Sequence, residues 1–208
     1  MLKVQKFVTG PLRSNTYLVY KDGAAEAALI DPMRGKERIK AFAANLGLKI
    51  TSVLITHGHF DHCLEARDWQ QEGAKVTVHE ADAERLNGGQ NLGAVFGVVV
   101  PPCKADILVK DGDHIVAAGI DFKVIHTPGH SPGSCCYLAE TCLFSGDTLF
   151  AGTVGRTDFE GGSYQDILQS VQKLFALQGD YTVYPGHEDT TTLQRERNEN
   201  CTVREIQN

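Results

Sequence analysis

The sequence predicts an α/β protein in which two β-sheets pack face to face and helices cover their outer surfaces. Three observations predict it: strands alternate with helices in the first half, strands dominate the second half, and no linker or low-complexity segment interrupts the 208 residues. With 42% apolar and 22% charged residues, the chain can bury a substantial core. We therefore expect a single domain spanning residues 1–208.

In the first half, short apolar runs bounded by Gly, Pro and Asp predict strands. Ile39, Phe42, Ala43 and Leu46 recur at helical spacing, and Gly47 follows where a helix would end. The predicted elements are, in order, strands 2–8, 15–20 and 25–30, helix 34–46, strand 50–55, helix 62–72, strand 75–79 and helix 80–86.

Residues 87–102 break this pattern. Gly88, Gly89 and Gly93 lead into an apolar patch that ends at Pro101 and Pro102. A long loop that covers a site is one interpretation, and an edge strand over 94–100 is the other.

The second half is predicted to be rich in strands. Ile167, Leu168, Val171, Leu174 and Phe175 form the inward face of an amphipathic helix. The predicted elements are strands 107–109, 114–117, 121–126, 134–138 and 141–145, helix 163–175, strand 181–184 and helix 189–197.

Composition excludes several classes of partner. The net charge is −6 and no cluster of Lys and Arg stands out, which disfavours nucleic acid. The longest apolar run, 94–100, is too short to cross a bilayer, and the N-terminus lacks the apolar segment of a secretion signal. The six cysteines include no C-x-x-C pair and are expected to be mostly buried thiols. We expect a cytoplasmic protein that acts on a small molecule.

Four segments share one design, a short apolar strand followed by a sharp turn with metal-type ligands. Such turns let a rigid scaffold aim side chains from distant parts of the chain at one point. The segments are T-H-G-H-F-D-H at 56–62, H-T-P-G-H at 126–130, S-G-D-T at 145–148 and P-G-H at 185–187. Their candidate ligands are His57, His59, Asp61, His62, His130, Asp147 and His187.

The first of these segments is the most specific. His57 and His59 are two residues apart in an extended turn and can hold one ion, while Asp61 and His62 can face a second ion. A solvated His-rich loop is the alternative, but so dense a group of imidazoles and carboxylates favours Zn, Fe or Mn. Taken alone, the other segments would be ordinary turns. Together the seven residues suffice for two ions that share one carboxylate.

These motifs, with G-D-T-L-F at 146–150 and G-R-T-D-F-E-G-G at 155–162, resemble the metallo-β-lactamase-fold hydrolases of the glyoxalase II-like branch. The resemblance extends over essentially the whole chain. It implies an αββα four-layer sandwich with the site along one edge of the paired sheets. It also implies that His57, His59 and His130 hold one metal, that Asp61, His62 and His187 hold a second, and that Asp147 bridges them.

The implied activity is thioester hydrolysis of the S-D-lactoylglutathione type. Two divalent ions sharing a water lower its pKa, so no protein nucleophile is needed. Asp61 and Asp147 are the predicted catalytic residues, with Asp61 also orienting the metal-bridging hydroxide. Zinc is the favoured metal, with iron and manganese as alternatives.

Substrate selection is predicted to involve Arg156 and Phe159. Dedicated glyoxalase II enzymes have a Lys and a Tyr in this stretch that help bind glutathione, and they carry a C-terminal helical extension that this sequence lacks. Arg156 is expected to pair with a carboxylate of an acidic thiol, and an ion pair with Asp158 is the equal alternative.

Three rival functions stay open. G-R-T-D-F also occurs in mononuclear iron persulfide dioxygenases, for which the ligands here would be His57, His130 and Asp147. A lactonase or β-lactamase-like hydrolase is the second rival. The third is a non-catalytic metal-binding or redox partner protein, although relatives of the flavodiiron type carry Glu where this chain has His59.

Other polar residues near these motifs are assigned supporting roles. His79, His114 and His126 are expected to be structural or to support a ligand. Asp31 is either the partner of a metal-bound histidine or a turn residue. Cys63 is expected to be buried packing rather than a thiolate ligand.

Overall fold

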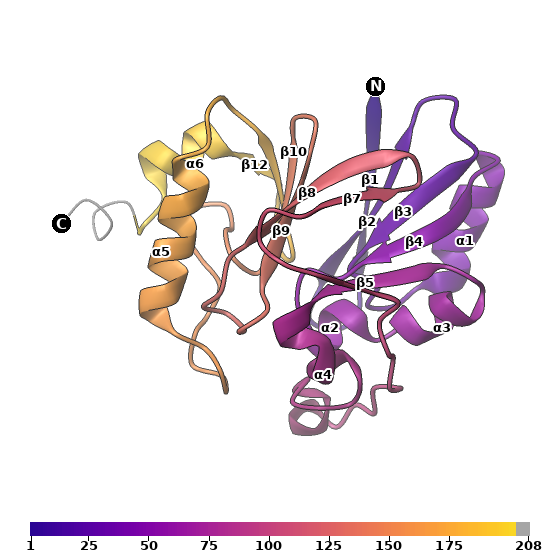
Figure 1. Ribbon diagram of the computed structural model, residues 1–208, viewed down its shortest axis with the longest axis horizontal. Coiled ribbons are helices and arrows are strands. Elements are labelled where there is room, and N and C mark those ends of the chain that lie inside the picture. Colours follow the sequence, from indigo (N-terminus) through magenta and orange to yellow (C-terminus); the bar gives the residue numbers. More distant parts are fainter. Residues whose placement is uncertain (203–208) are drawn as a thin grey trace.

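The computed structural model describes residues 1–202, and residues 203–208 of the predicted domain lie outside that range. Two six-stranded sheets form its centre (Figure 1). The first contains β1 (Leu2–Thr9), β2 (Ser14–Lys21), β3 (Glu26–Ile30), β4 (Lys49–Leu54), β5 (Lys75–His79) and β6 (Ile107–Val109). The second contains β7 (His114–Ala117), β8 (Ile120–His126), β9 (Cys135–Ala139), β10 (Cys142–Gly146), β11 (Thr182–Pro185) and β12 (Thr191–Thr192).

Both sheets are mixed, and in each the strands lie in chain order. In the first sheet β1, β2 and β3 are antiparallel, and β3, β4, β5 and β6 are parallel. In the second sheet only β10 and β11 are parallel. Parallel neighbours need a crossover connection, and helices supply several of these. β4 and β11 each have a parallel neighbour, and the turns that follow them lie at their carboxyl ends.

Helices cover the outer face of each sheet, as Figure 1 shows. On the first sheet lie α1 (Lys36–Asn45), α2 (Phe60–Cys63), α3 (Ala66–Gln71) and α4 (Ala83–Leu86), which follows the 3₁₀ helix η1 (Glu80–Asp82). On the second lie α5 (Tyr164–Phe175) and α6 (Leu193–Glu199).

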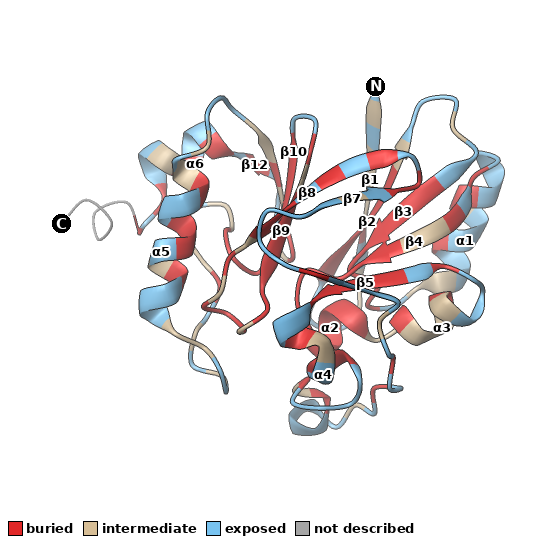
Figure 2. Cartoon of the chain, in the orientation of Figure 1, coloured by how far each residue is buried: buried red, intermediate tan, exposed pale blue. Residues whose placement is uncertain are grey.

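Three apolar clusters separate the four layers. Ile39 and Trp69 pack the first helical layer onto its sheet. Tyr17, Phe122 and Phe144 belong to the cluster between the sheets, and Val171 and Leu174 belong to the third, under α5. Figure 2 accordingly shows the sheets largely buried between the helical layers. The predicted αββα sandwich is confirmed.

Two predicted helices were wrong in their limits. The helix predicted over 62–72 is divided into α2 and α3 because the amide of Glu65 donates to the carbonyl of Pro32 at 2.9 Å instead of continuing the helix. The helix predicted over 189–197 begins only at Leu193. Thr191 and Thr192 pair with β11, and the Thr192 hydroxyl caps the helix by accepting from the Arg195 amide.

Smaller differences concern exposed apolar residues. Leu46, predicted on the inward face of its helix, is 47% exposed because it lies one residue beyond the end of α1.

Within 87–102 the structure has the 3₁₀ helix η2 (Gly93–Phe96) and no strand, so the loop interpretation is confirmed over the edge strand. None of the helices in residues 1–202 is both long and apolar enough to span a membrane.

All six cysteines are free thiols, five of them buried and Cys201 exposed. The adjacent Cys135 and Cys136 lie on β9 and belong to different clusters, Cys135 between the sheets and Cys136 under α5. This follows from the alternation of side chains along a strand. Cys63 is buried as packing, as expected.

Candidate metal centre

The four turns with candidate ligands come together from both sheets. β4 leads to His57 and His59, β8 leads to His130, β10 ends beside Asp147, and β11 leads to His187. Asp61 and His62 lie on the short helix α2. All seven predicted residues are brought to one place, at the edge where the two sheets face each other.

Three histidines form the group that we call the first ligand group, His57, His59 and His130. One ring nitrogen of each lies within 4.8 Å of the others. His59 Nδ1 and His130 Nε2 are only 2.9 Å apart, and all three rings are buried.

Asp61, His62 and His187 form the second ligand group. His62 Nε2 lies 3.3 Å from His187 Nε2, and Asp61 Oδ2 lies 3.3 Å from His187 Nε2 and 3.5 Å from His62 Nε2. Each member thus directs one ligand atom at a common point.

Asp147 lies between the two groups. Its Oδ2 is 3.4 Å from His130 Nε2 in the first group and 3.5 Å from His187 Nε2 in the second. Its Oδ1 is 3.4 Å from His62 Nε2. A carboxylate in this position can contribute to both groups at once.

The residues fit divalent metal ions. His57 Nε2 and Asp147 Oδ1 are buried without a hydrogen-bond partner, which is costly unless another group satisfies them. Imidazole and carboxylate donors are the ligands that zinc, iron and manganese accept. A further cluster of Asp31, His57 and His62 is also compact, but Asp31 Oδ2 is occupied by hydrogen bonds from Thr56 and His62.

Outer hydrogen bonds orient three of the rings. His130 Nδ1 donates to the carbonyl of Arg156 at 2.7 Å, and His187 Nδ1 donates to the carbonyl of Leu12 at 3.2 Å. His62 Nδ1 donates to Asp31 at 3.0 Å, so the alternative of Asp31 as a histidine partner is the one observed. Each bond leaves Nε2 directed into its ligand group, as metal-binding histidines require.

Charge is distributed unequally over the two groups. Burial and the neighbouring histidines lower the pKa of His57 well below its usual range, and the same causes lower the pKa of His59 to about 2. Burial also disfavours charge on His62, but the carboxylates of Asp147 and Asp61 outweigh it and raise its pKa well above the usual value. The pKa of His187 is raised in the same way.

Asp82 is a buried residue of this region that the sequence analysis missed. Its carboxylate accepts from the Gly58 amide at 2.7 Å, the Ser131 hydroxyl at 2.7 Å and the Gly133 amide at 2.8 Å. It therefore ties the turn of His57 and His59 to the turn of His130. Nothing in the local sequence indicates this, because its partners are far away in the chain.

Two glycines are required by close packing at the centre. A Cβ on Gly186 would lie 2.1 Å from Asp147 Oδ1, and a Cβ on Gly155 would lie 1.8 Å from the carbonyl oxygen of Asp147. Any side chain at either position would displace Asp147, because backbone and ligand atoms leave no space.

A cavity of about 260 Å³ opens onto both ligand groups. Phe60, Leu92, Phe96 and Phe159 provide apolar walls, and Phe60 and Phe96 pack with ring centroids 5.1 Å apart. Two of these residues come from the loop over 87–102, which therefore forms one wall of the cavity.

Arg156 and Phe159, the predicted substrate-binding residues, both line this cavity. The Arg156 guanidinium, however, donates to both carboxylate oxygens of Asp158, with Nε at 2.7 Å from Oδ1, and lies 4.1 Å over the Phe159 ring. The ion pair with Asp158 is thus the alternative that the structure contains.

The remaining histidines lie outside both ligand groups. His79 and His126 stack on each other with ring centroids 4.0 Å apart, and His114 pairs with Asp121. Their expected supporting or structural character agrees with these contacts.

The sandwich and its His/Asp groups define a metal-dependent hydrolase. A model of the metallo-beta-lactamase superfamily matches residues 9–187, and the chain belongs to that superfamily. Among its relatives, an uncharacterized protein of Aquifex aeolicus is 34% identical over 193 residues, covering 90% of each chain. The probable metallo-hydrolase YqgX of Bacillus subtilis is 31% identical and covers 96% of each. Hydroxyacylglutathione hydrolase GloC of Haemophilus influenzae is 31% identical, covering 90% of this chain and 92% of GloC.

Solved structures agree with this assignment. The B3 metallo-beta-lactamase BLEG-1 superposes with a TM-score of 0.89 at 32% identity, covering 98% of this chain and 99% of its own. TTHA1623 in a di-iron-bound form gives a TM-score of 0.84 at 32% identity over 95% and 99% of the two chains. ETHE1 from Myxococcus xanthus gives 0.82 at 28% identity over 97% and 84%.

Proposed function

We propose that the protein is a binuclear metal-dependent thioester hydrolase of the glyoxalase II type, acting on S-D-lactoylglutathione or a related acyl-thiol. The observation that carries the proposal is the pair of three-residue ligand groups with Asp147 between them. The relative named hydroxyacylglutathione hydrolase GloC supports the choice of substrate class.

In this proposal His57, His59 and His130 hold one ion, Asp61, His62 and His187 hold the other, and Asp147 bridges them. Two ions held there would lower the pKa of a shared water and supply a hydroxide near neutral pH. Zinc is the proposed metal, with iron and manganese as alternatives, and the di-iron form of TTHA1623 supports keeping iron among them.

The chain's own residues orient the reacting groups. Ser14 donates to Asp61 Oδ2 at 3.1 Å, which fixes the carboxylate that we propose to orient the attacking water. Arg156 and Leu12 hold His130 and His187 through their carbonyls. The apolar wall of Leu92, Phe96 and Phe159 excludes bulk water from the scissile bond.

The test is hydrolysis of S-D-lactoylglutathione by the zinc-loaded protein, with Asp147→Ala as its matched variant. We expect turnover in the wild type and its collapse in the variant. Absence of turnover in a metal-loaded wild type would contradict the glutathione thioester while leaving the metal centre in place.

A mononuclear iron persulfide dioxygenase is the second candidate. The G-R-T-D-F stretch at 155–159 and the likeness to ETHE1 favour it. Asp61, His62 and His187 are each held in place by a hydrogen bond to a residue outside the ligand groups. This favours two metals, because an enzyme with one metal would use none of these three residues as ligands. The second candidate would be favoured if the iron-loaded protein contained one iron per chain and consumed oxygen with glutathione persulfide as substrate.

A further inference from the structure

The cavity at the ligand groups continues into a groove. A neighbouring cavity of about 500 Å³ shares Leu12, Asp147, Arg156 and His187 with it. A third, of about 380 Å³, shares Arg13 and Glu188 with the second. We call the second and third cavities together the tail groove, because they lead from the ligand groups to Lys6 and Val8 of β1 and Asn15 of β2.

The two ends of this path differ in chemistry. The end over the ligand groups is walled by Phe60, Leu92, Phe96 and Phe159. The far end of the tail groove is bordered by charged side chains of both signs, Lys6, Arg13, Glu188 and Asp189. An elongated substrate would therefore place an apolar or small acyl group at one end and a charged group at the other.

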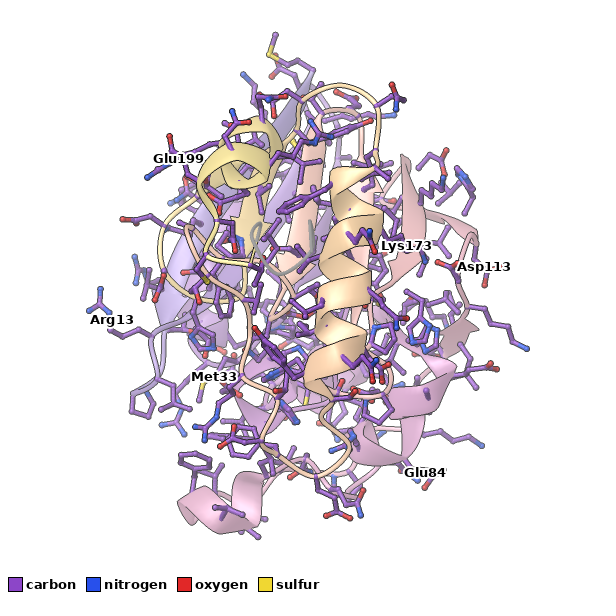
Figure 3. All side chains as sticks on the ribbon, turned by 90° about the vertical axis from the view of Figure 1, so that its left-hand side faces the viewer. Arg13, Met33, Glu84, Asp113, Lys173 and Glu199 are labelled. Atoms are coloured by element: carbon purple, nitrogen blue, oxygen red, sulfur yellow. The ribbon has the colours of Figure 1, made fainter. Side chains whose placement is uncertain are left out.

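The cations along the path differ in availability. Arg156 is paired with Asp158 through two nitrogens, and Lys6 contacts Asp189 Oδ1 at 3.4 Å and the Glu188 carbonyl at 3.2 Å. Within residues 1–202, no ion pair or side-chain hydrogen bond involves Arg13. Figure 3 shows its side chain extending outward from the turn that carries it. An anionic substrate group can therefore pair with Arg13 without breaking an existing ion pair.

The backbone at Arg13 is strained and tied to the metal centre. Its φ is 57°, which is uncommon for a long side chain, and its amide donates to the Gly10 carbonyl at 3.2 Å. The preceding carbonyl, of Leu12, accepts from His187 Nδ1. One turn thus orients a ligand of the second group and carries Arg13 at the border of the groove beside it. Strain of this kind collects at functional sites.

We propose that Arg13 is the anion-binding residue of the substrate site. It pairs with a carboxylate on the thiol part of the thioester, while the acyl group occupies the apolar cavity next to Phe96. The inference rests on the proposed thioester hydrolase function, and it assigns to Arg13 the role that the sequence suggested for Arg156. Glu188 and Asp189 border the same groove, so it accepts a thiol bearing carboxylates and an amino group better than a polyanionic phosphorylated thiol.

The test compares three D-lactoyl thioesters, those of glutathione, of coenzyme A and of the neutral thiol N-acetylcysteamine, on the zinc-loaded protein. Arg13→Gln keeps the length of the side chain and removes its charge. We expect KM for the glutathione ester to rise about tenfold with kcat unchanged, as for loss of one charge-assisted hydrogen bond. Kinetics on the N-acetylcysteamine ester should not change, and the coenzyme A ester should have the highest KM of the three.

Lys123→Gln is the matched control, because Lys123 is an exposed cation on β8 that lines none of the three cavities. It should leave all three esters unaffected. Added salt should raise KM for the glutathione ester in the wild type and not in Arg13→Gln.

Several outcomes would overturn the inference. An unchanged KM for the glutathione ester in Arg13→Gln would do so, as would the same rise appearing in Arg156→Gln instead. A fall in kcat on the neutral ester would assign Arg13 to the support of His187 rather than to binding. If the wild type hydrolysed none of the esters, the proposed function itself would fail and the inference with it.

Discussion

The two ligand groups lie side by side, yet the pKa values of their histidines are shifted in opposite directions. In the first group, three buried imidazoles face one another, and the pKa values of His57 and His59 are lowered. In the second, carboxylates raise the pKa values of His62 and His187, and those imidazoles form ion pairs with Asp61 and Asp147.

The difference indicates how each group depends on metal. Protons on His62 and His187 satisfy the second group internally when no ion is bound. The first group contains no carboxylate except Asp147 at its border, and the Nε2 atom of His57 is left without a partner. The first group is therefore built for an ion, whereas in the second group an ion must displace protons.

The largest effect should come from removing one ligand of each group. His57→Ala should abolish the first site and lower hydrolysis more than about 100-fold, beyond the loss expected for an outer contact. His187→Ala should leave one ion per chain bound in the first group, with hydrolysis also strongly reduced.

Metal content by mass spectrometry, measured beside the kinetics, checks this pair. A His187→Ala protein that lost both ions together would show that the groups are not separable.

A smaller effect is expected from the residues that orient each group. Asp82→Asn should weaken the ion of the first group by about 10- to 100-fold, because its carboxylate joins the turns that carry His57, His59 and His130. Asp31→Asn should weaken both ions, because its carboxylate accepts from His62 and also from Thr56, whose hydroxyl lies 3.1 Å from His57 Nδ1. Competition with a chelator measures the two affinities.

Asp121→Asn is the matched control, since Asp121 is an exposed partner of His114. Equal loss from both sites in Asp82→Asn would contradict the assignment of Asp82 to the first group.

The smallest effect concerns pH. His62 and His187 have raised pKa values, so falling pH adds protons that compete with the second ion, by about tenfold in affinity per pH unit for each proton displaced. His59, with its pKa at about 2, and His57 stay neutral, so the first ion should persist to lower pH. Titrating metal content from about pH 8 to 5 should release one ion before the other, and simultaneous release would remove the contrast.

Most of the ligand groups could be predicted from sequence because each ligand follows the end of a short apolar strand, a pattern that is local in the chain. His57 and His59 needed only this rule. The outer contacts could not be predicted in the same way. Asp82 bonds to Ser131 and Gly133, which are far from it in the chain. Sequence spacing could not decide whether Arg156 pairs with Asp158 or stays available to substrate, and the structure contains the ion pair.

The fold was predicted at the level of layers and most strands, and strands 75–79, 107–109 and 114–117 agree residue by residue. The errors occur where tertiary contacts override a local pattern. The Glu65 amide bonds to the Pro32 carbonyl, so helical hydrogen bonding is interrupted there. Thr191 and Thr192 pair with β11, so the last helix begins only at Leu193.

The central claim is that two ions share Asp147, and metal stoichiometry tests it most directly. Zinc-loaded wild type, freed of loosely bound metal, should contain two ions per chain, and Asp147→Ala should lose both or retain a single weakly held ion. One tightly bound ion per wild-type chain, unaffected in number by loss of Asp147, would contradict the account.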